Sequence, residues 1–298
     1  MIYYMERVAN KMRIISIITL YNPGEKIIEN VKLVSEQSDL TILADNSSSD
    51  NSKMFESLSN VEYNGNLKNL GLSLAFNKIL KDSKYGWDED DYIVFFDQDS
   101  KIKPDHIKCL INKFEYIKSK GYNVGCIGPV YYNTSNNTVE IPRIKNDIND
   151  KDMLVSSIIT SSMLTTYGIL KKVGFWNEEI FLDMADWDLC WRLMKYNYKC
   201  AMTKEVVLKH SLGEGEKKIL FFSLRIGKPF REYYQIRDCQ YLLEKDYIPM
   251  KYRIRFHLIL TLRSFLHILF LDDRKERIKY MKKGYKDYKN RVRGELKI

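Results

Sequence analysis

An apolar run that ends in two aspartates constrains the fold of this chain more than any other feature. Tyr92–Phe96 is apolar and rich in β-branched and aromatic residues, which is typical of a strand buried on both faces of a sheet. Asp97-Gln98-Asp99-Ser100 follows directly, at the strand end where open α/β sheets bind ligands. Two neighbouring carboxylates repel each other, and a divalent cation carrying a diphosphate would remove that repulsion. The alternative interpretation is an ordinary solvated turn.

Strand-like and helix-like segments alternate around this run. Arg13–Leu20 and Leu40–Ala44 are β-branched, and Ile27–Val34 between them has the spacing of a helix with one apolar face. A strand–helix–strand order predicts a parallel sheet. Because no linker separates two equal domains, we expect one α/β domain over residues 1–240 and a C-terminal helical region over residues 241–298.

Cysteine usage and the N-terminus bear on the cellular compartment. The five cysteines are scattered and contain no Cys-x-x-Cys pair, so the sequence predicts neither a zinc site nor a disulfide framework, and a reducing cytoplasm fits best. Residues 1–13 lack the apolar core of a signal peptide, which argues against secretion.

The positive charge of the chain is concentrated at its C-terminal end. The formal net charge is +9, yet residues 245–298 hold 16 Lys and Arg against 6 Asp and Glu, a net of about +10. This segment contains the apolar run Phe256–Leu271, which Arg263 interrupts and which is too short to span a membrane. A basic amphipathic helix that lies on anionic lipid is predicted. The alternatives are a helix packed on the main domain and a nucleic-acid-binding tail.

Two further acidic clusters accompany Asp97 and Asp99. Asp45 follows a predicted strand, and the second cluster opens a predicted helix with Asp183, Asp186 and Asp188. The carboxyl ends of parallel strands share one edge, so Asp45 and Asp97 should face the same crevice. The Asp45 segment suits a nucleobase edge or a ribose hydroxyl, although an Asx-turn is an equally good interpretation.

Seven short motifs follow one another along the chain: Ile17–Pro23, Asp45–Ser48, Asn69–Gly71 with Asn77, Asp97–Ser100, Phe181–Arg192, His210–Gly213 and Arg231–Asp238. In this order they resemble family 2 glycosyltransferases of the GT-A fold, and within them the bacterial rhamnosyltransferase-like branch. The resemblance covers roughly residues 13–240, and Asp238 and Ala185 stand where the family usually has Asn and Glu.

The resemblance implies a Rossmann-like, mainly parallel sheet flanked by helices, with a C-terminal helical appendage, and it implies a divalent metal, Mg2+ or Mn2+. Asp99 is the expected direct ligand, Asp97 positions the ribose or shares the metal, and His210 completes the coordination. The residues expected at the donor are Thr19, Tyr21, Asn22, Asp45, Asn69, Gly71, Asn77, Asp97, Gln98 and Asp99.

Inversion at the anomeric carbon needs a base that takes the proton of the acceptor hydroxyl. Asp186 is the expected base, with Asp188 and Asp183 as alternatives. Trp187 is expected to stack on the acceptor unless it is a core residue. Arg231, Tyr234 and Arg237 are expected to contact acceptor or phosphate, with structural ion pairs as the alternative for the arginines.

The function implied by the resemblance is a metal-dependent inverting transfer of L-rhamnose from dTDP-β-L-rhamnose to a lipid-linked surface-polysaccharide precursor. The enzyme would be cytoplasmic and peripheral on the inner face of the cell membrane, attached through residues 241–298, without nucleic acid as a partner and compatible with a homodimer. The alternatives are another nucleotide sugar such as a UDP-hexose, a non-catalytic subunit with the same fold, and a basic nucleic-acid-binding protein. A nucleotidyltransferase is disfavoured because the first strand is not followed by a Gly-rich phosphate loop.

Overall fold

The computed structural model describes residues 12–133, 138–142, 145–210, 216–219, 222–225 and 227–297. Residues 1–11 therefore lie outside the described residues. In the expected motif His210–Gly213, the residues Ser211–Gly213 and the side chain of His210 also lie outside the described part of the chain.

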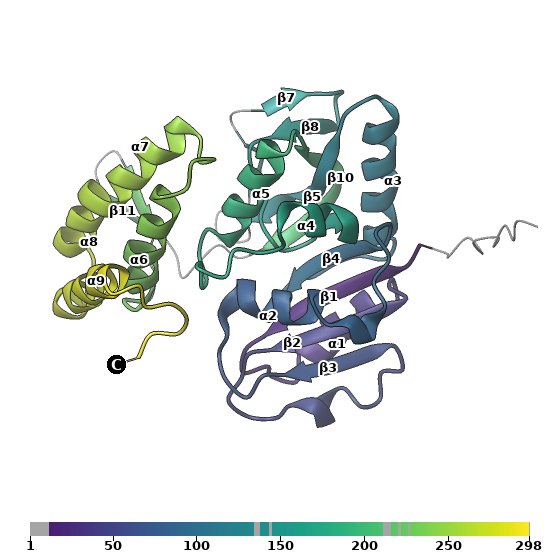
Figure 1. Ribbon diagram of the computed structural model, residues 1–298, viewed down its shortest axis with the longest axis horizontal. Helices are drawn as coiled ribbons and strands as arrows, with labels where there is room; N and C mark the ends of the chain where they lie inside the picture. The colour runs from purple at the N-terminus through teal and green to yellow at the C-terminus, as the bar shows by residue number, and fades with distance from the viewer. Residues whose placement is uncertain are drawn as a thin grey trace, which may run out of the picture.

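The N-terminal half forms the predicted parallel sheet. Strands β1 (Ile14–Leu20), β2 (Leu40–Asp45), β3 (Val61–Gly65) and β4 (Tyr92–Asp97) pair in the order β3-β2-β1-β4, all parallel. Helices α1 (Ile27–Ser35), α2 (Gly71–Leu80) and α3 (His106–Ser119) connect or follow them, with short 3-10 turns at Ser52–Met54 and Ser83–Tyr85. Helices cover both faces of the sheet, so β1 and β4 are buried on both sides (Figure 1).

The second half extends the same sheet with mixed strand directions. Its order continues β4-β9-β5-β10-β8-β7, and β9 runs antiparallel to both β4 and β5. In the polar segment from Tyr132 to Asp152, the described residues include two short strands that extend the sheet. The elements are β5 (Val124–Asn133), β6 (Thr138–Glu140), β7 (Lys145–Asp147), β8 (Asp152–Val155), β9 (Met163–Thr166), α4 (Tyr167–Val173), α5 (Ala185–Lys195) and β10 (Lys199–His210).

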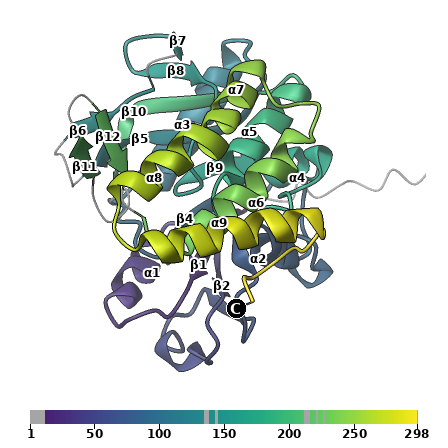
Figure 2. The same ribbon diagram turned by 90° about the vertical axis from the view of Figure 1, so that its left-hand side faces the viewer.

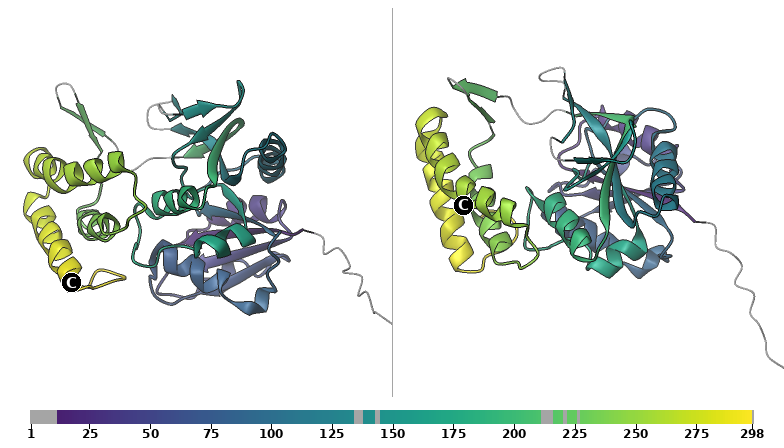
Figure 3. Two further views of the ribbon diagram at one scale, coloured as in Figure 1. Left: turned by 45° about the horizontal axis from the view of Figure 1, so that its top comes forward. Right: turned by 90° about the horizontal axis from the view of Figure 1, so that it is seen from above.

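The C-terminal helices form an appendage beside the sheet, as expected (Figures 1 and 3). A hairpin of β11 (Glu216–Ile219) and β12 (Phe222–Arg225) precedes α6 (Arg231–Leu243), α7 (Met250–Leu258), the π-helix η3 (Ile259–Arg263), α8 (Ser264–Phe270) and α9 (Arg274–Lys289). The boundary expected at residue 240 falls inside α6.

Helix α6 packs closely on α9. A Cβ atom at Gly284 in α9 would lie 2.5 Å from the Tyr233 carbonyl oxygen, so only glycine permits this approach. In the part of the chain that the structure describes, no helix is long and apolar enough to cross a membrane.

A buried ionic cluster holds the appendage together. Glu232 of α6 accepts hydrogen bonds from His267 Nδ1 (2.6 Å) and from Arg277 Nη1 (3.1 Å), and all three side chains are buried. Burial alone would raise the pKa of Glu232, but His267, Arg263 and Arg277 outweigh that effect and lower it. The carboxylate therefore stays charged and ties α6 to α8 and α9.

Candidate active site

The ends of three parallel strands bring the predicted donor residues to one edge of the sheet. Leu20 pairs with Asp45 across β1 and β2, and Thr19 pairs with Asp97 across β1 and β4. The predicted juxtaposition of Asp45 and Asp97 is therefore present in the fold. Thr19 Oγ1 donates a 3.4 Å hydrogen bond to the Phe96 carbonyl, so its side chain lies along the sheet.

The acidic run forms a tight turn at this edge. The Ser100 N–H donates to the Asp97 carbonyl (3.0 Å), and the Asp97 N–H donates to Ser100 Oγ (3.2 Å). This turn leaves Asp97 partly exposed and Asp99 exposed. Gln98 instead accepts from the Tyr21 N–H (2.8 Å) and donates to the Tyr21 carbonyl (3.3 Å), so it fixes the end of β1 beside the turn.

Backbone pairing brings the end of β10 to the same turn. Lys209 forms an isolated antiparallel bridge with Lys101, two residues after Asp99. His210, the third predicted metal ligand, is the next residue and the last of β10. The backbone thus places all three predicted ligand positions at one corner of the sheet.

Asp45 is buried and already bonded within the chain. Its Oδ1 accepts from the Ser47 N–H (2.8 Å) and hydroxyl (2.6 Å), and its Oδ2 accepts from Asn51 Nδ2 (2.8 Å) and the Tyr63 hydroxyl (2.8 Å). The Asx-turn that the sequence allowed is formed. Asn22 continues this arrangement, because its N–H donates to Ser47 Oγ (2.7 Å). The Asp45 carboxylate therefore shapes the donor loop, and its contact with a donor remains a prediction.

The start of α2 is hydrogen-bonded to Phe181, five residues before the predicted base Asp186. Asn69 Oδ1 accepts from the Gly71 N–H (2.9 Å), and the Leu72 N–H donates to the Phe181 carbonyl (2.8 Å). Gly71 has a φ of +75°, and a Cβ there would lie 2.4 Å from the Phe181 oxygen. Asn69 and Gly71 therefore allow the start of α2 to pack closely on the backbone of Phe181.

Asn77, farther along α2, also uses its side chain for hydrogen bonds within the protein. Its amide is buried and bridges the Trp176 backbone, donating to the carbonyl (2.9 Å) and accepting from the N–H (3.0 Å). A role at the donor would have to be indirect.

Asp186 lies in the first turn of α5 and is surrounded by other acids. Its side chain is partly exposed and accepts a hydrogen bond from the Trp187 N–H (2.8 Å). Burial raises the pKa of Asp186 from 3.8 to about 8, with smaller contributions from Cys190 and then from the charges of Asp183 and Asp97. Asp97 is therefore near enough to Asp186 for its charge to contribute to this shift, and Asp186 has the strongly raised pKa of a candidate proton acceptor.

The two alternative bases have other partners. Asp188 is fully buried and accepts from Arg192 Nε (2.7 Å), Asn177 Nδ2 (3.0 Å) and the Tyr247 hydroxyl. Asp183 forms an ion pair with Arg231 and accepts from Gln235 Nε2 at 3.2 Å. Because both carboxylates hold cations of the chain, Asp186 is the aspartate of α5 best placed to take a proton.

The predicted acceptor residues divide into buried and accessible ones. Arg237 is fully buried, with Asp238 Oδ1 at 2.7 Å and the Gly294 carbonyl at 2.7 Å, so it forms the structural ion pair that the sequence left as an alternative. Tyr234 is also buried and stacks on Phe181 with ring centroids 4.5 Å apart. Arg231 remains partly exposed beside Asp183.

Two arginines of the appendage lie near these residues, and the sequence did not predict either as a site residue. The Arg255 guanidinium of α7 lies 4.8 Å from the centre of the Trp187 ring, and Arg263 lies 3.7 Å from Glu232. Trp187 is partly exposed, and its ring is 6.3 Å from that of Phe256, so one side packs on α7. The basic character of the tail was visible in the sequence, but which cations turn inward depends on the packing of α7 and η3.

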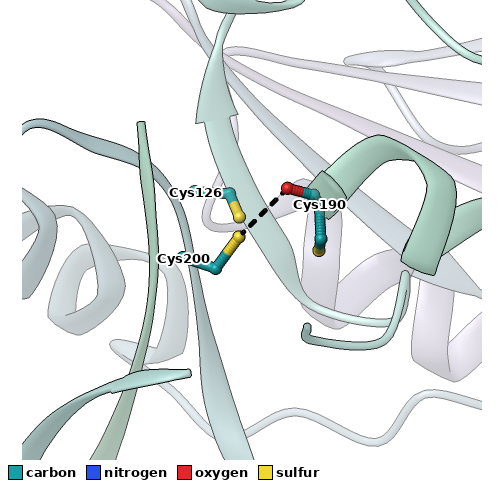
Figure 4. Close-up of side chains that lie close together, drawn as sticks. All are labelled: Cys126, Cys190 and Cys200. Atoms are coloured by element: carbon teal, nitrogen blue, oxygen red, sulfur yellow. Dashed lines mark hydrogen bonds between the residues drawn. The ribbon is translucent and has the colours of Figure 1, made fainter. Parts of the chain in front are cut away.

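Three of the five cysteines lie together behind Asp186, although their spacing gave no sign of it. Cys126, Cys190 and Cys200 are buried, with their sulfur atoms within 4.8 Å of one another (Figure 4). The Cys190 thiol donates a weak hydrogen bond to the Ile158 carbonyl, and the Cys200 thiol donates one to the Cys190 carbonyl, each at 3.9 Å. The cluster therefore fits small, weakly polar side chains packed between β5, β10 and α5.

Comparison with known proteins agrees with this geometry. A curated relative, the dTDP-rhamnosyl transferase RfbF of Shigella flexneri, is 30% identical over 204 residues, which make up 64% of this chain and 65% of that protein. The match thus spans slightly less than two thirds of the relative.

Among solved structures, a crystal structure of GalNAc-T7 with UDP, GalNAc and Mn2+ is similar, with a TM-score of 0.54 and 10% identity over 95% of this chain and 57% of that one. At this identity the likeness shows the fold alone, and it confirms the predicted GT-A architecture. Residues 16–173 match Glycosyl transferase family 2. Because this match covers more than half of the sequence, the chain belongs to glycosyl transferase family 2.

Proposed function

We propose that this glycosyltransferase transfers L-rhamnose from dTDP-β-L-rhamnose, with inversion, to a lipid-linked precursor of a surface polysaccharide. The likeness to a dTDP-rhamnosyl transferase supports the donor. Since the donor is the β-anomer, the expected product is an α-linked rhamnoside. The observation that carries the proposal is the position of Asp186 at the start of α5, where burial, with a smaller contribution from the charge of Asp97, raises its pKa to about 8.

In this proposal Asp186 takes the proton of the acceptor hydroxyl as the oxygen attacks the anomeric carbon. In the metal-free protein the raised pKa marks a carboxylate that accepts a proton more readily than an exposed aspartate, and a bound cation would lower this pKa and so increase the ionised fraction at neutral pH. Its hydrogen bond from the Trp187 N–H holds one carboxylate oxygen toward the helix. The other oxygen is then available to the acceptor.

The residues at the acidic turn fit a divalent cation of the Mg2+ or Mn2+ type. Asp97 and Asp99 offer oxygen ligands on one turn, and the like charges around Asp186 show an excess of negative charge that a cation would relieve. Asp99, with Asp97 and His210, would hold the ion. When bound, the cation supplies positive charge to the departing diphosphate.

The acceptor would enter between α5 and the appendage. Trp187, Arg231 and Arg255 line the sides of this approach, and a guanidinium suits the phosphate of a lipid-linked acceptor. We also propose that the enzyme works at the cytoplasmic face of the cell membrane, with residues 241–298 as its attachment.

A thermal-shift screen of nucleotide sugars with and without Mn2+ tests the donor and the metal together. Bound ligand raises the apparent stability, so dTDP-rhamnose with metal should give the largest shift in Tm. A larger shift with a uridine sugar would contradict the rhamnose assignment.

A transfer assay then tests the residue roles. Asp186→Asn should keep the donor-induced shift and lose transfer, whereas Asp99→Ala should lose the metal-dependent part of the shift. Full transfer by both variants would refute the proposed site.

A further inference from the structure

A row of large apolar side chains lies exposed along α7, η3 and α8. The row follows a spacing of four, four, four, three and four residues, and each side chain is between 41% and 70% exposed. We call it the docking face, and its members are Met250, Ile254, Leu258, Leu262, Phe265 and Leu269. Six neighbouring side chains of this kind form a patch, in contrast to the single exposed apolar residues that are normal on protein surfaces.

The docking face is opposite the side by which these helices pack on the protein. Tyr252, Phe256, Ser264 and His267 are buried, and they follow the docking-face residues by two positions, about half a helical turn. In a regular α-helix, steps of four residues would rotate the row by about 40° each. The wider turn of the π-helix η3 offsets this drift, so the row stays in line.

The charges around the docking face are mainly positive. Residues 250–271 contain four Lys or Arg and no Asp or Glu, and residues 272–289, which follow, contain eight Lys or Arg against four acids. Figure 2 shows α7, α8 and α9 together at the front of the appendage. A second copy of this region, also with a net charge of about +10, would be repelled, whereas a negatively charged surface would be attracted.

We infer that the docking face inserts into the surface of a bilayer rich in anionic phospholipid, with α7 and α8 lying in the membrane plane. Apolar side chains on one side of a helix and cations flanking them are the two features that such binding requires. The inference deepens the proposed membrane attachment and assigns it to a defined set of side chains.

This orientation would also place the start of α5 close to the membrane surface. Arg255 is on the same helix as the docking face, but its guanidinium lies over Trp187 in the first turn of α5. Trp187 and the first turn of α5 would then lie about one helix diameter, roughly 10 Å, from the bilayer surface. A phosphate at the membrane surface would be within reach of Arg255.

Vesicle sedimentation of the full chain tests the inference. The probes are vesicles of phosphatidylcholine alone and of phosphatidylcholine with 30% phosphatidylglycerol, each in 0.1 M and 0.5 M NaCl. We expect binding to the anionic vesicles at low salt and much weaker binding in the other conditions. The double variant L258S/F265S should lower the partition coefficient by at least about tenfold.

The matched control is Y116S/Y196S, which removes two exposed aromatic side chains far from the appendage in sequence. It should bind anionic vesicles like the unchanged protein. Because all four positions are exposed, an unchanged Tm verifies that each variant folds. Asp186→Asn should bind vesicles normally without transfer, so failure of the proposed chemistry is distinguishable from failure of docking.

Three results would overturn the inference. One is the absence of vesicle binding, and another is equal binding by L258S/F265S and the unchanged protein. The third is a dimer in solution that L258S/F265S converts to a monomer, because the docking face would then be an interface between two copies.

Discussion

Replacing Asp186 by Asn should abolish sugar transfer and, in the metal-free protein, stabilise the fold. Burial and the neighbouring acids raise the pKa of Asp186 from 3.8 to about 8. As the pH rises, the unfolded chain therefore loses this proton before the folded chain does. Between pH 4 and pH 8 the carboxyl group progressively favours the unfolded state. Asn is uncharged and nearly the same shape, so it removes this penalty.

The size of the gain follows from the pKa shift. At pH 7 the interval above the unfolded pKa is about three pH units, at about 1.4 kcal/mol each, which sets an upper limit of about 4 kcal/mol. Asp186 is partly exposed, so solvent screening reduces this value, and we expect about 2 kcal/mol. A chain of this size should then gain about 4 °C in Tm.

The assay is urea and thermal unfolding of both proteins in EDTA at several pH values between 4 and 8.5. EDTA is needed because a cation near Asp97 would lower the pKa of Asp186. The stability difference should vanish near pH 4 and grow toward pH 8.

Asp188→Asn is the matched control, two residues farther along α5. It leaves the largely buried Arg192 without its carboxylate and should destabilise the protein by about 3 kcal/mol. If Asp186→Asn is no more stable than the unchanged protein at pH 7, or if its gain is the same at pH 4.5 and pH 7.5, the reasoning about Asp186 is wrong.

Three further predictions concern the metal turn, the α2 contact and the appendage. Asp99→Ala should lower the Mn2+-dependent affinity for dTDP by at least about tenfold in calorimetry with little change in Tm, because Asp99 is exposed; an unaltered metal dependence would exclude it as a ligand. Gly71→Ala should lower the free energy of unfolding in urea by about 2–3 kcal/mol, because the added Cβ would contact the Phe181 oxygen. The control Gly174→Ala has a φ of +85° but open space around it, so it should lower that free energy by only about 1 kcal/mol. Equal losses in the two variants would argue against the Phe181 contact. Glu232→Gln should lower the free energy of unfolding by about 3 kcal/mol at pH 7. Because the pKa of Glu232 is lowered in the folded protein, the stability difference between the variant and the unchanged protein should become smaller as the pH falls below 4.5. A stability difference that does not change with pH would contradict the ionic role of Glu232.

Strands β1, β2 and β4 of the parallel half could be predicted because they are mostly buried and read as nearly continuous apolar runs, whereas the edge strand β3 is only half-buried. Strand β10 was harder to see, since Lys204 and Glu205 interrupt it. The pairing of β10 with β5 shifts register between Thr203 and Val207, so an irregularity there accommodates these charged residues without ending the strand. A pattern of alternating residues does not reveal such a shift.

The positions of the site acids followed from the sequence, but their individual roles did not. Asp45, Asn77 and Arg237 have the residue types of ligand-binding groups, yet each is buried and bonded within the chain. For Asn77 and Arg237 the partners are distant in sequence, such as Trp176 for Asn77 and Gly294 for Arg237. A motif shows that a polar group has a partner, but only the fold shows whether that partner is internal. The three-cysteine cluster was hidden for the same reason.

Phe181 limits how this protein can be divided or recombined. Its carbonyl accepts from Leu72 of the sheet domain, while its N–H donates to Asp238 of α6 (3.0 Å) and its ring stacks on Tyr234. One residue, five positions before Asp186, is therefore bonded to both parts of the molecule. A truncation before α6 would leave a buried N–H without its acceptor beside the reaction centre. A chimera that exchanges the C-terminal helices with those of a relative should therefore take Phe181, with the residues beside it, and α6 from the same parent protein.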